Sequence, residues 1–249
     1  MIPLKEQEIL RQKFAQELVH QVKIDFFTQK ELGIYVPGKE PCPTCRPTQE
    51  LLQELASLTD KISLRLHVLE EEPELARSMG VDRVPAIVLR GRDGVALKFF
   101  GFPGGYEFPE LVDTIVHLSR EEAPVPEEAQ RHIRQLKQDV LVRVFVTPTC
   151  PYCPQMARAA YGLAMVNPKV HAEVVEVSQF PELSKRYNVR AVPLTVINER
   201  VAIPGAIPAK VLAEQIVKVA SQTLTRTPTS SGESSPVEGE PKAGGLILP

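Results

Sequence analysis

The spacing of apolar residues in the first half of the chain predicts an ordered series of strands and helices. A short apolar run at residues 24–28 predicts a buried strand. Leucines at positions 51, 52, 55 and 58 lie on one face of a 3.6-residue repeat and predict a helix at residues 46–58. A strand, a short helix, two strands and a helix follow, at residues 63–69, 72–79, 84–90, 96–101 and 106–120.

The same order of elements returns in the second half. We expect a strand, a helix, a strand, a helix, two strands and a helix at residues 140–147, 154–166, 171–178, 180–187, 192–198, 200–205 and 208–220. A further helix precedes each series, at residues 5–20 and 127–139. Each half therefore reads β–α–β–α–β–β–α, which predicts the α/β class with a mixed central sheet flanked by helices.

A single displacement of 108 residues relates several separated features of the two halves. It connects two Cys-x-x-Cys motifs and two Val-Pro pairs: Cys42 and Cys45 with Cys150 and Cys153, and Val84 and Pro85 with Val192 and Pro193. Agreement at several separated positions indicates duplication of one supersecondary unit. The sequence therefore predicts two tandem domains of the same fold.

Composition sets the expected domain limits. A stretch rich in charge and proline predicts a linker at residues 121–128, between domains at residues 1–120 and 129–220. Residues 221–249 are dense in Ser, Thr, Pro, Gly and Glu. Because such a segment offers little apolar surface to offset the entropy of ordering it, we expect a flexible, disordered C-terminal tail.

Charge and hydropathy exclude several classes of partner. The net charge of −2 gives no reason to expect nucleic acid or an acidic membrane surface as a partner. Neither a signal peptide nor an apolar run of membrane-spanning length is visible, so we expect a cytoplasmic protein. In that compartment a cysteine pair is more often catalytic or metal-binding than structural.

The position of the cysteines predicts reactive sulfur. A thiol attacks a disulfide only as its thiolate, and the positive end of a helix dipole stabilises that anion. Cys42 and Cys150 each lie where a strand leads into a predicted helix, so we expect them to be the attacking cysteines. Cys45 and Cys153 lie one turn further along on the same helix face, where they can resolve a mixed disulfide.

Two other interpretations of the four cysteines are weaker. A shared zinc site usually separates its two pairs by roughly 15–20 residues, whereas 104 residues intervene here. Inert disulfides are known in intracellular proteins of hyperthermophiles. However, a bridge between residues three apart closes almost no loop and stabilises little.

With the Val-Pro proline 43 residues after the first cysteine of each pair, the chain resembles the glutaredoxin-like protein disulfide oxidoreductases of thermophilic bacteria and archaea. This resemblance implies two tandem thioredoxin folds and thiol–disulfide exchange on protein disulfides or dithiols, by reduction, oxidation or isomerisation. It implies no metal or organic cofactor, and a flavoprotein of the thioredoxin reductase kind as partner. The chain is also similar to the thioredoxin-like module of alkyl hydroperoxide reductase flavoproteins, which typically keeps one cysteine pair.

The resemblance also implies roles for residues outside the cysteine motifs. It implies that Pro85 and Pro193 are cis, and that Val84 and Val192 offer backbone groups to an extended substrate strand. Asp25 resembles the buried acid of thioredoxins that accepts the proton of the resolving cysteine. The alternative for Asp25 is a solvated aspartate on an edge strand. By the same comparison, Val144 occupies the matching position in the second half, which would leave that half without the acid.

Several functional alternatives stay open from the sequence. An electron relay to a peroxidase and a glutathione-dependent glutaredoxin are the enzymatic ones. A peptide-binding chaperone module with structural disulfides is the non-enzymatic one. We further hypothesise that the second motif, CPYC, is the more reactive because its short connection from the strand fixes the pair tightly. The natural clients, the direction of electron flow and the oligomeric state are not specified by these patterns.

Overall fold

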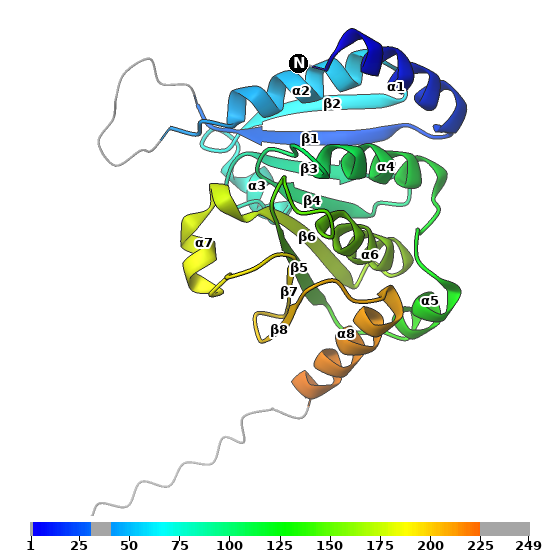
Figure 1. The fold of residues 1–249 in the computed structure, drawn as a ribbon, viewed down its shortest axis with the longest axis vertical. Helices are drawn as coiled ribbons and strands as arrows, with labels where there is room; N and C mark the ends of the chain where they lie inside the picture. The colour runs from blue at the N-terminus through cyan, green and yellow to red at the C-terminus, as the bar shows by residue number, and fades with distance from the viewer. Residues whose placement is uncertain (1, 31–40, 225–249) are drawn as a thin grey trace, which may run out of the picture.

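A computed structural model describes residues 2–30 and 41–224 of the chain. Its centre is one mixed sheet of eight strands in the order β2-β1-β3-β4-β6-β5-β7-β8, which runs from top to bottom in Figure 1. The long connection that precedes Cys42 falls at residues 31–40 and lies outside the described residues.

The predicted order of elements is confirmed in both halves. The first half contains α1 (Leu4–Glu17), β1 (Val22–Thr28), α2 (Cys45–Ser57), β2 (Ile62–Val68), α3 (Pro73–Ser78), β3 (Ala86–Arg90), β4 (Ala96–Phe100) and α4 (Glu107–Arg120). The second half contains α5 (Glu127–Arg134), β5 (Val140–Val146), α6 (Cys153–Val166), β6 (Val170–Glu176), η1 (Val177–Gln179), α7 (Pro181–Arg186), β7 (Leu194–Ile197), β8 (Val201–Pro204) and α8 (Ala209–Leu224). The short 3-10 helix η1 was not predicted, and α5 ends at Arg134 rather than at residue 139.

The two halves join edge to edge through a parallel pairing of β4 with β6. Lys98, Phe99 and Phe100 pair with Glu173, Val174 and Val175 in this ladder. Within each half the pattern is the same: the first strand pairs parallel with the second and antiparallel with the third, which pairs antiparallel with the fourth. The sequence predicts two sheets but not their fusion into one.

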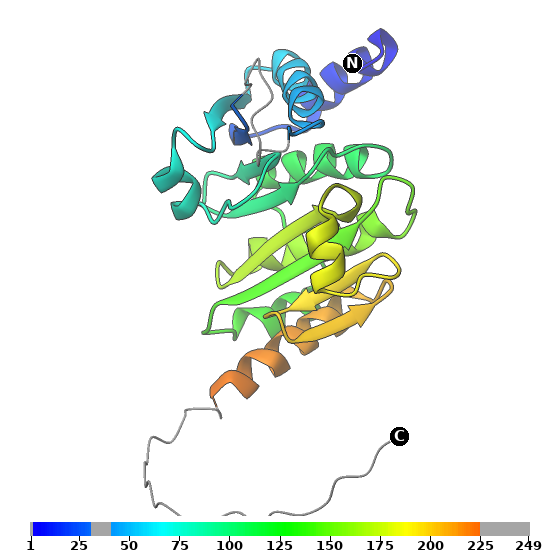
Figure 2. The ribbon, with the colours of Figure 1, turned by 90° about the vertical axis from the view of Figure 1, so that its left-hand side faces the viewer.

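Helices cover both faces of the sheet, and residue alternation along β1 shows how. Ile24 and Phe26 lie in the larger core under α1, α2 and α4, which continues under α5, α6 and α8. Phe27 points to the opposite face and packs in the smaller core with residues of α3 and α7 (Figures 1 and 2). Because side chains of a strand alternate between faces, this parity decides which residues can approach the helices that carry cysteines.

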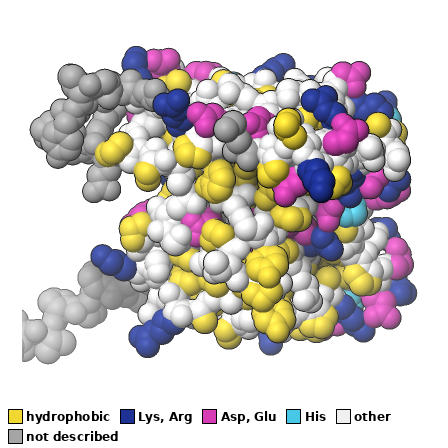
Figure 3. Space-filling model, turned by 45° about the horizontal axis from the view of Figure 1, so that its top comes forward, with side chains coloured by type: hydrophobic (Ala, Val, Ile, Leu, Met, Phe, Trp, Pro, Cys, Tyr) yellow, Lys and Arg dark blue, Asp and Glu magenta, His cyan; other side chains and the backbone are white. Residues whose placement is uncertain are grey.

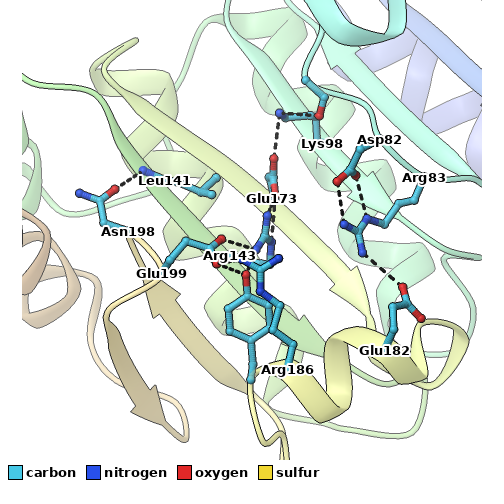
Figure 4. A network of polar contacts seen from close by, with 12 residues as sticks. Asp82, Arg83, Lys98, Leu141, Arg143, Glu173, Glu182, Arg186, Asn198 and Glu199 are labelled. Atoms are coloured by element: carbon cyan, nitrogen blue, oxygen red, sulfur yellow. Dashed lines mark hydrogen bonds and ion pairs between the residues drawn. The ribbon is translucent and has the colours of Figure 1, made fainter. Parts of the chain in front are cut away.

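An ion-pair network crosses the junction between the halves. Lys98 on β4 and Arg143 on β5 both bind the carboxylate of Glu173 on β6, at 2.9 Å and 2.8 Å (Figure 4). The side chain of Glu173 is only 7% exposed, so the pairing satisfies a nearly buried charge. Nearby, Arg83 of the first half lies 3.4 Å from Glu182 of the second half (Figure 4).

The remaining features concern the surface and the ends. Acidic and basic side chains are interspersed on the face shown in Figure 3. Across residues 2–30 and 41–224, the model contains no helix with the length and apolarity needed to span a bilayer. Helix α8 runs to Leu224, past the expected start of the tail at residue 221, and residues 225–249 lie outside the described part. Within the expected linker, Val125 is buried in the larger core.

Candidate functional site

Both cysteine pairs lie at the same edge of the sheet. Strands β1, β2, β4, β5 and β6 all run in one direction, so the carboxyl ends of β1 and β5 share an edge. These two ends lead toward Cys42 and Cys150. Four interstrand steps separate β1 from β5, which corresponds to about 19 Å. The spacing of the pairs is therefore fixed by the sheet.

The first pair, Cys42 and Cys45, forms a disulfide with a Cα–Cα distance of 5.4 Å. Cys45 is the first residue of α2 and is buried, whereas Cys42 precedes the helix and is half-buried. The N–H of Cys42 donates to Oε1 of Gln29 at 2.7 Å, and the N–H of Cys45 donates to the carbonyl of Cys42 at 3.4 Å. The half-buried sulfur is the one that a substrate can reach.

The second pair repeats this geometry with deeper burial. Cys150 and Cys153 form a disulfide with a Cα–Cα distance of 5.5 Å, and Cys153 begins α6. Cys150 is 8% exposed and Cys153 is fully buried. The N–H of Cys150 donates to the carbonyl of Thr147 at 3.1 Å, which keeps the connection from β5 short and ordered.

Helix termini give both sites a favourable field for anionic sulfur. The first N–H groups of a helix have no partner within it, and the aligned peptide dipoles place about half a positive charge there. Helices α2 and α6 contain 13 and 14 residues and begin at Cys45 and Cys153. After reduction, a thiolate at Cys42 or Cys150 would lie within one turn of these N–H groups. This arrangement lowers the pKa expected for an attacking thiol.

The predicted cis prolines are confirmed. The Val84–Pro85 and Val192–Pro193 peptide bonds are both cis. Sγ of Cys150 lies 3.7 Å from the carbonyl oxygen of Val192, so the residue before the proline borders the second disulfide. Both prolines are buried, and both valines are half-buried.

A glycine supports each proline from the strand beyond it. The N–H of Gly101 donates to the carbonyl of Pro85, and that of Gly205 donates to the carbonyl of Pro193, both at 2.8 Å. The φ angles of these glycines are +105° and +77°. Because side chains disfavour this region, glycine is the residue that suits both positions. The repeat therefore extends beyond the motifs that the sequence displays.

Asp25 is buried in an ion-pair cluster. Its side chain is 1% exposed and accepts from Nε of Arg90 at 2.8 Å, while its other oxygen lies 3.1 Å from Nε2 of His67. Strand β1 lies between β2 and β3, so the alternative of a solvated aspartate on an edge strand is wrong. The partners are an arginine and a histidine.

The expected match between Asp25 and Val144 is also wrong. Asp25 pairs with Val88 across β1 and β3, and the residue opposite the equivalent Val196 is Arg143. Val144 instead matches Phe26. A difference of one residue along a strand moves a side chain to the other face of the sheet.

The shift in register places Asp25 away from the helix that carries the cysteine. Phe26 lies in the core under α2, and Asp25 points to the opposite face, with Phe27. This placement favours a structural ion pair. A role for Asp25 in accepting the proton of Cys45 stays a prediction.

A buried glutamate that the sequence analysis missed lies beside the second site. Glu107, the first residue of α4, is 1% exposed, and its Oε1 atom has no hydrogen-bond partner among the described residues. Burial, together with the nearby carboxylates of Glu110 and Glu176, raises the pKa of Glu107 to about 8. A carboxyl group with this pKa can exchange a proton near neutral pH.

Two contacts place Glu107 near the second cysteine pair. The preceding residue, Tyr106, donates its N–H to the carbonyl of Pro148 at 3.0 Å, two residues before Cys150. Glu176, which acts on the charge of Glu107, pairs with Val146 at the end of β5. A glutamate in the first turn of a helix is usually exposed. Its burial here results from the packing of α4 against α6 across the two halves, which no local pattern displays.

A second carboxyl group on α4 is neutralised differently. Glu110 is 3% exposed and lies 2.7 Å from Nη2 of Arg158 on α6. Burial raises the pKa of Glu110 to about 7, and the guanidinium of Arg158 opposes that rise. The ion pair fastens α4 of the first half to the helix that begins at Cys153.

The geometry does not support one metal site formed by all four sulfurs. Each pair is closed in its own disulfide, and the pairs lie on strands four positions apart in the sheet. In the part of the chain that the structure describes, no group of three or more His, Cys, Asp or Glu residues is arranged to hold a metal ion.

Comparison with known proteins agrees with this architecture. Residues 140–218 match the family described as "Thioredoxin domain". A solved structure of a mutant of the alkyl hydroperoxide reductase AhpF from Enterococcus faecalis (V583) is 30% identical, with 86% of this chain and 98% of that chain covered and a TM-score of 0.74. A protein disulfide oxidoreductase from Aeropyrum pernix K1 has the same fold, at 24% identity, with 89% and 95% covered and a TM-score of 0.78.

Among curated proteins, the alkyl hydroperoxide reductase of the same F type from Xanthomonas campestris pv. phaseoli is 26% identical over 174 residues. The match covers 69% of this chain but only 30% of that protein, so the chain spans less than a third of the length of this relative. Two thioredoxin-like halves, each with a Cys-x-x-Cys disulfide at a helix start and a cis proline, are now established from both the fold and these relatives. The chain belongs to the thiol–disulfide oxidoreductase family built from tandem thioredoxin folds.

Proposed function

We propose that the protein exchanges thiols and disulfides with protein substrates through both cysteine pairs. The observation that carries this proposal is the repeated geometry of a helix-start disulfide beside a cis proline, with Sγ of Cys150 3.7 Å from the carbonyl oxygen of Val192. An inert bridge needs neither a helix terminus nor a neighbouring backbone edge.

In the reducing direction, the thiolate of Cys42 or Cys150 attacks one sulfur of a substrate disulfide. This step forms a mixed disulfide and releases the other substrate sulfur as a thiolate, which takes a proton. Cys45 or Cys153 then loses its proton and attacks the enzyme sulfur of the mixed disulfide. The second substrate thiol leaves, and the enzyme pair closes as the disulfide seen here. Oxidation of a substrate dithiol is the reverse sequence.

Substrate binding is proposed at the two Val-Pro segments. An extended peptide can pair with the backbone of Val84 beside the first site or of Val192 beside the second. Main-chain pairing of this kind gives affinity without sequence specificity. The cis prolines Pro85 and Pro193 hold the valines in the orientation that such pairing needs.

Glu107 is proposed as the proton acceptor for Cys153. Its pKa of about 8 is close to that of a resolving thiol, which favours proton transfer near neutral pH. Its unpartnered Oε1 atom is free to take the proton without breaking another hydrogen bond among the described residues. Asp25 stays a candidate for the same role at the first site, although its carboxylate already binds Arg90 and His67.

Reduction of insulin by dithiothreitol tests the proposal. We expect the wild-type chain to accelerate the reaction, and each double variant that keeps one pair (Cys42→Ser with Cys45→Ser, or Cys150→Ser with Cys153→Ser) to retain part of the rate. A folded variant without any of the four cysteines should show none. Full activity in that variant would contradict the proposal and favour a peptide-binding module with structural disulfides.

A second candidate function is electron transfer to a peroxide-reducing protein. The observation in its favour is the 30% identity to the alkyl hydroperoxide reductase AhpF over nearly the whole length of that solved chain. In this case a flavoprotein reductase would supply the electrons. Rapid reduction by such a flavoprotein with NADH or NADPH, compared with glutathione, distinguishes this route from that of a glutaredoxin.

A further inference from the structure

A side chain of the second half reaches into the first cysteine motif. Oε1 of Gln179, the last residue of η1, accepts a hydrogen bond from the hydroxyl of Thr44 at 2.6 Å. Thr44 lies between Cys42 and Cys45. The same oxygen accepts from the N–H of Phe102, in the loop after β4, at 3.2 Å. Gln179 is 135 residues from Thr44 in sequence, so only the joining of the halves creates this contact.

The orientation of the Gln179 amide follows from its neighbours. Its Nε2 atom donates to the carboxylate of Glu176, which is 1% exposed and also accepts from the N–H of Ser178 at 3.1 Å. A carboxylate only accepts, and the backbone N–H of Phe102 only donates. Oε1 must therefore face Phe102, and the Thr44 hydroxyl must be the donor to Gln179.

Thr44 is held from its backbone as well. Its carbonyl oxygen accepts from the N–H of Thr48 at 3.0 Å and from the Thr48 hydroxyl at 2.6 Å. With the side chain fixed by Gln179 and the carbonyl fixed by α2, the turn that joins Cys42 to Cys45 has little freedom.

Gly101 provides the space for this contact. A Cβ atom at position 101 would lie 3.2 Å from Nε2 of Gln179 and 2.9 Å from Cβ of Glu176. The N–H of the same glycine donates to the carbonyl of Pro85. Gln179 is therefore packed between the cysteine motif and the cis-proline segment of the first site.

The second site has no equivalent arrangement among the described residues. The residue 108 positions before Gln179 is Glu71, which binds Nζ of Lys30 at 2.6 Å. The counterpart of Thr44 is Tyr152, whose side chain is 65% exposed. The contact distinguishes the two pairs.

We propose that Gln179 is a positioning residue of the second half that sets the redox equilibrium of the Cys42–Cys45 pair. In the dithiol form, the anchored turn keeps the two thiols close to the geometry of the disulfide, so closing the bond loses little conformational entropy. Oxidation by glutathione disulfide transfers two electrons: two thiols lose their protons and form the bond, and two glutathione molecules leave. Without the anchor, the dithiol gains freedom and the disulfide is favoured less.

The test measures the equilibrium of each pair with glutathione in the full chain. In the Cys150→Ser/Cys153→Ser background, Gln179→Met should lower the equilibrium constant for disulfide formation about five- to tenfold, because about one hydrogen bond is lost. This change corresponds to a reduction potential about 20–30 mV more positive. In the Cys42→Ser/Cys45→Ser background, the same substitution should leave the equilibrium of Cys150–Cys153 unchanged.

Further variants separate positioning from loosening. Thr44→Val should reproduce the shift, Thr44→Ser should largely preserve the wild-type value, and Thr44→Val with Gln179→Met should shift no further than either alone. Gln130→Met, which removes an amide bonded to the Val125 carbonyl at 3.0 Å, is the matched control and should have no effect.

The inference rests on the proposed exchange activity only in that the first pair must be redox-active. An unchanged equilibrium in folded Gln179→Met, or an equal shift of both pairs, would overturn it. If the equilibria behave as expected but neither pair reduces insulin, the inference stands and the proposed function fails. Thermal unfolding of each variant verifies that the comparison is made between folded proteins.

Discussion

The backbone N–H of Tyr106 donates to the carbonyl oxygen of Pro148 at 3.0 Å, across the junction of the two halves. The preceding residue, Gly105, has a φ angle of +56°, and a Cβ atom there would lie 2.1 Å from the same oxygen. The loop after β4 thus packs directly against the connection that leads from β5 to Cys150. The first half supplies part of the second site, and Gln179 of the second half supplies part of the first.

Gly105→Ala tests the importance of this contact. We expect it to lower the free energy of unfolding by about 2–4 kcal/mol, because backbone strain adds to a clash with Pro148. It should also slow exchange by the second pair. Gly94→Ala is the matched control, since Gly94 has a φ of +85° with nothing within 4 Å of an added Cβ. Chemical denaturation of both variants measures the difference, and equal losses would contradict the clash.

The stability of the protein should depend on pH through Glu107. Its pKa rises from 4.5 to about 8 on folding, so between these values the folded state binds a proton that the unfolded state lacks. The associated stability is complete below about pH 4.5 and is lost as the pH rises toward 8. Glu107→Gln removes this titration. Relative to wild type, its free energy of unfolding should increase with pH by up to about 1.4 kcal/mol per unit in this window. A constant difference from pH 5 to 8 would contradict the raised pKa.

The same substitution should slow catalysis at one site only. In the Cys42→Ser/Cys45→Ser background, Glu107→Gln should reduce the rate of insulin reduction at least about tenfold, because Cys153 loses its proton acceptor. In the Cys150→Ser/Cys153→Ser background, the rate should stay within about twofold. The pH profile of the rate provides the decisive readout, since the limb assigned to Glu107 should disappear. Equal slowing in both backgrounds would indicate a general structural effect.

Asp25 should matter more for stability than for exchange. Asp25→Ala leaves the guanidinium of Arg90, whose side chain is 30% exposed, without its partner and should cost about 2–4 kcal/mol. Exchange by the first pair, measured well below the unfolding temperature, should change less than about twofold. A large loss of rate with a shifted pH profile in folded protein would instead support Asp25 as the proton acceptor of Cys45.

Removal of one pair at a time tests the asymmetry of the two sites. The short connection between β5 and Cys150 is described and ordered, with the N–H of Cys150 bound to Thr147. We expect loss of Cys150 and Cys153 to reduce insulin reduction more than loss of Cys42 and Cys45. The initial rates of the two double variants at equal concentration measure this, and the opposite order would contradict the hypothesis.

The local features of this fold could be predicted from the sequence because each has a local cause. Leucine spacing marks α2, and the displacement of 108 residues marks the duplication. The two Val-Pro pairs mark the cis bonds that the structure contains. In each case the signal resides in residues that are close together or related by the repeat.

The features that were missed depend on the contact between the halves. Glu107 is buried by α6, and Gln179 reaches Thr44 from more than a hundred residues away. The error at Asp25 has a different origin. Counting back from the cysteines is accurate to about one residue, and one residue along a strand changes the face of the sheet. Pairing with Val88 settled the register, and only the structure provides that pairing.

The β4–β6 ladder also limits what a single molecule can do with four sulfurs. Since no hinge separates the halves within the sheet, the two disulfides cannot approach each other to trade electrons directly. Their span of about 19 Å equals the length of about six residues of extended chain. A client whose two cysteines are about that far apart could be held at both grooves at once, one sulfur at each.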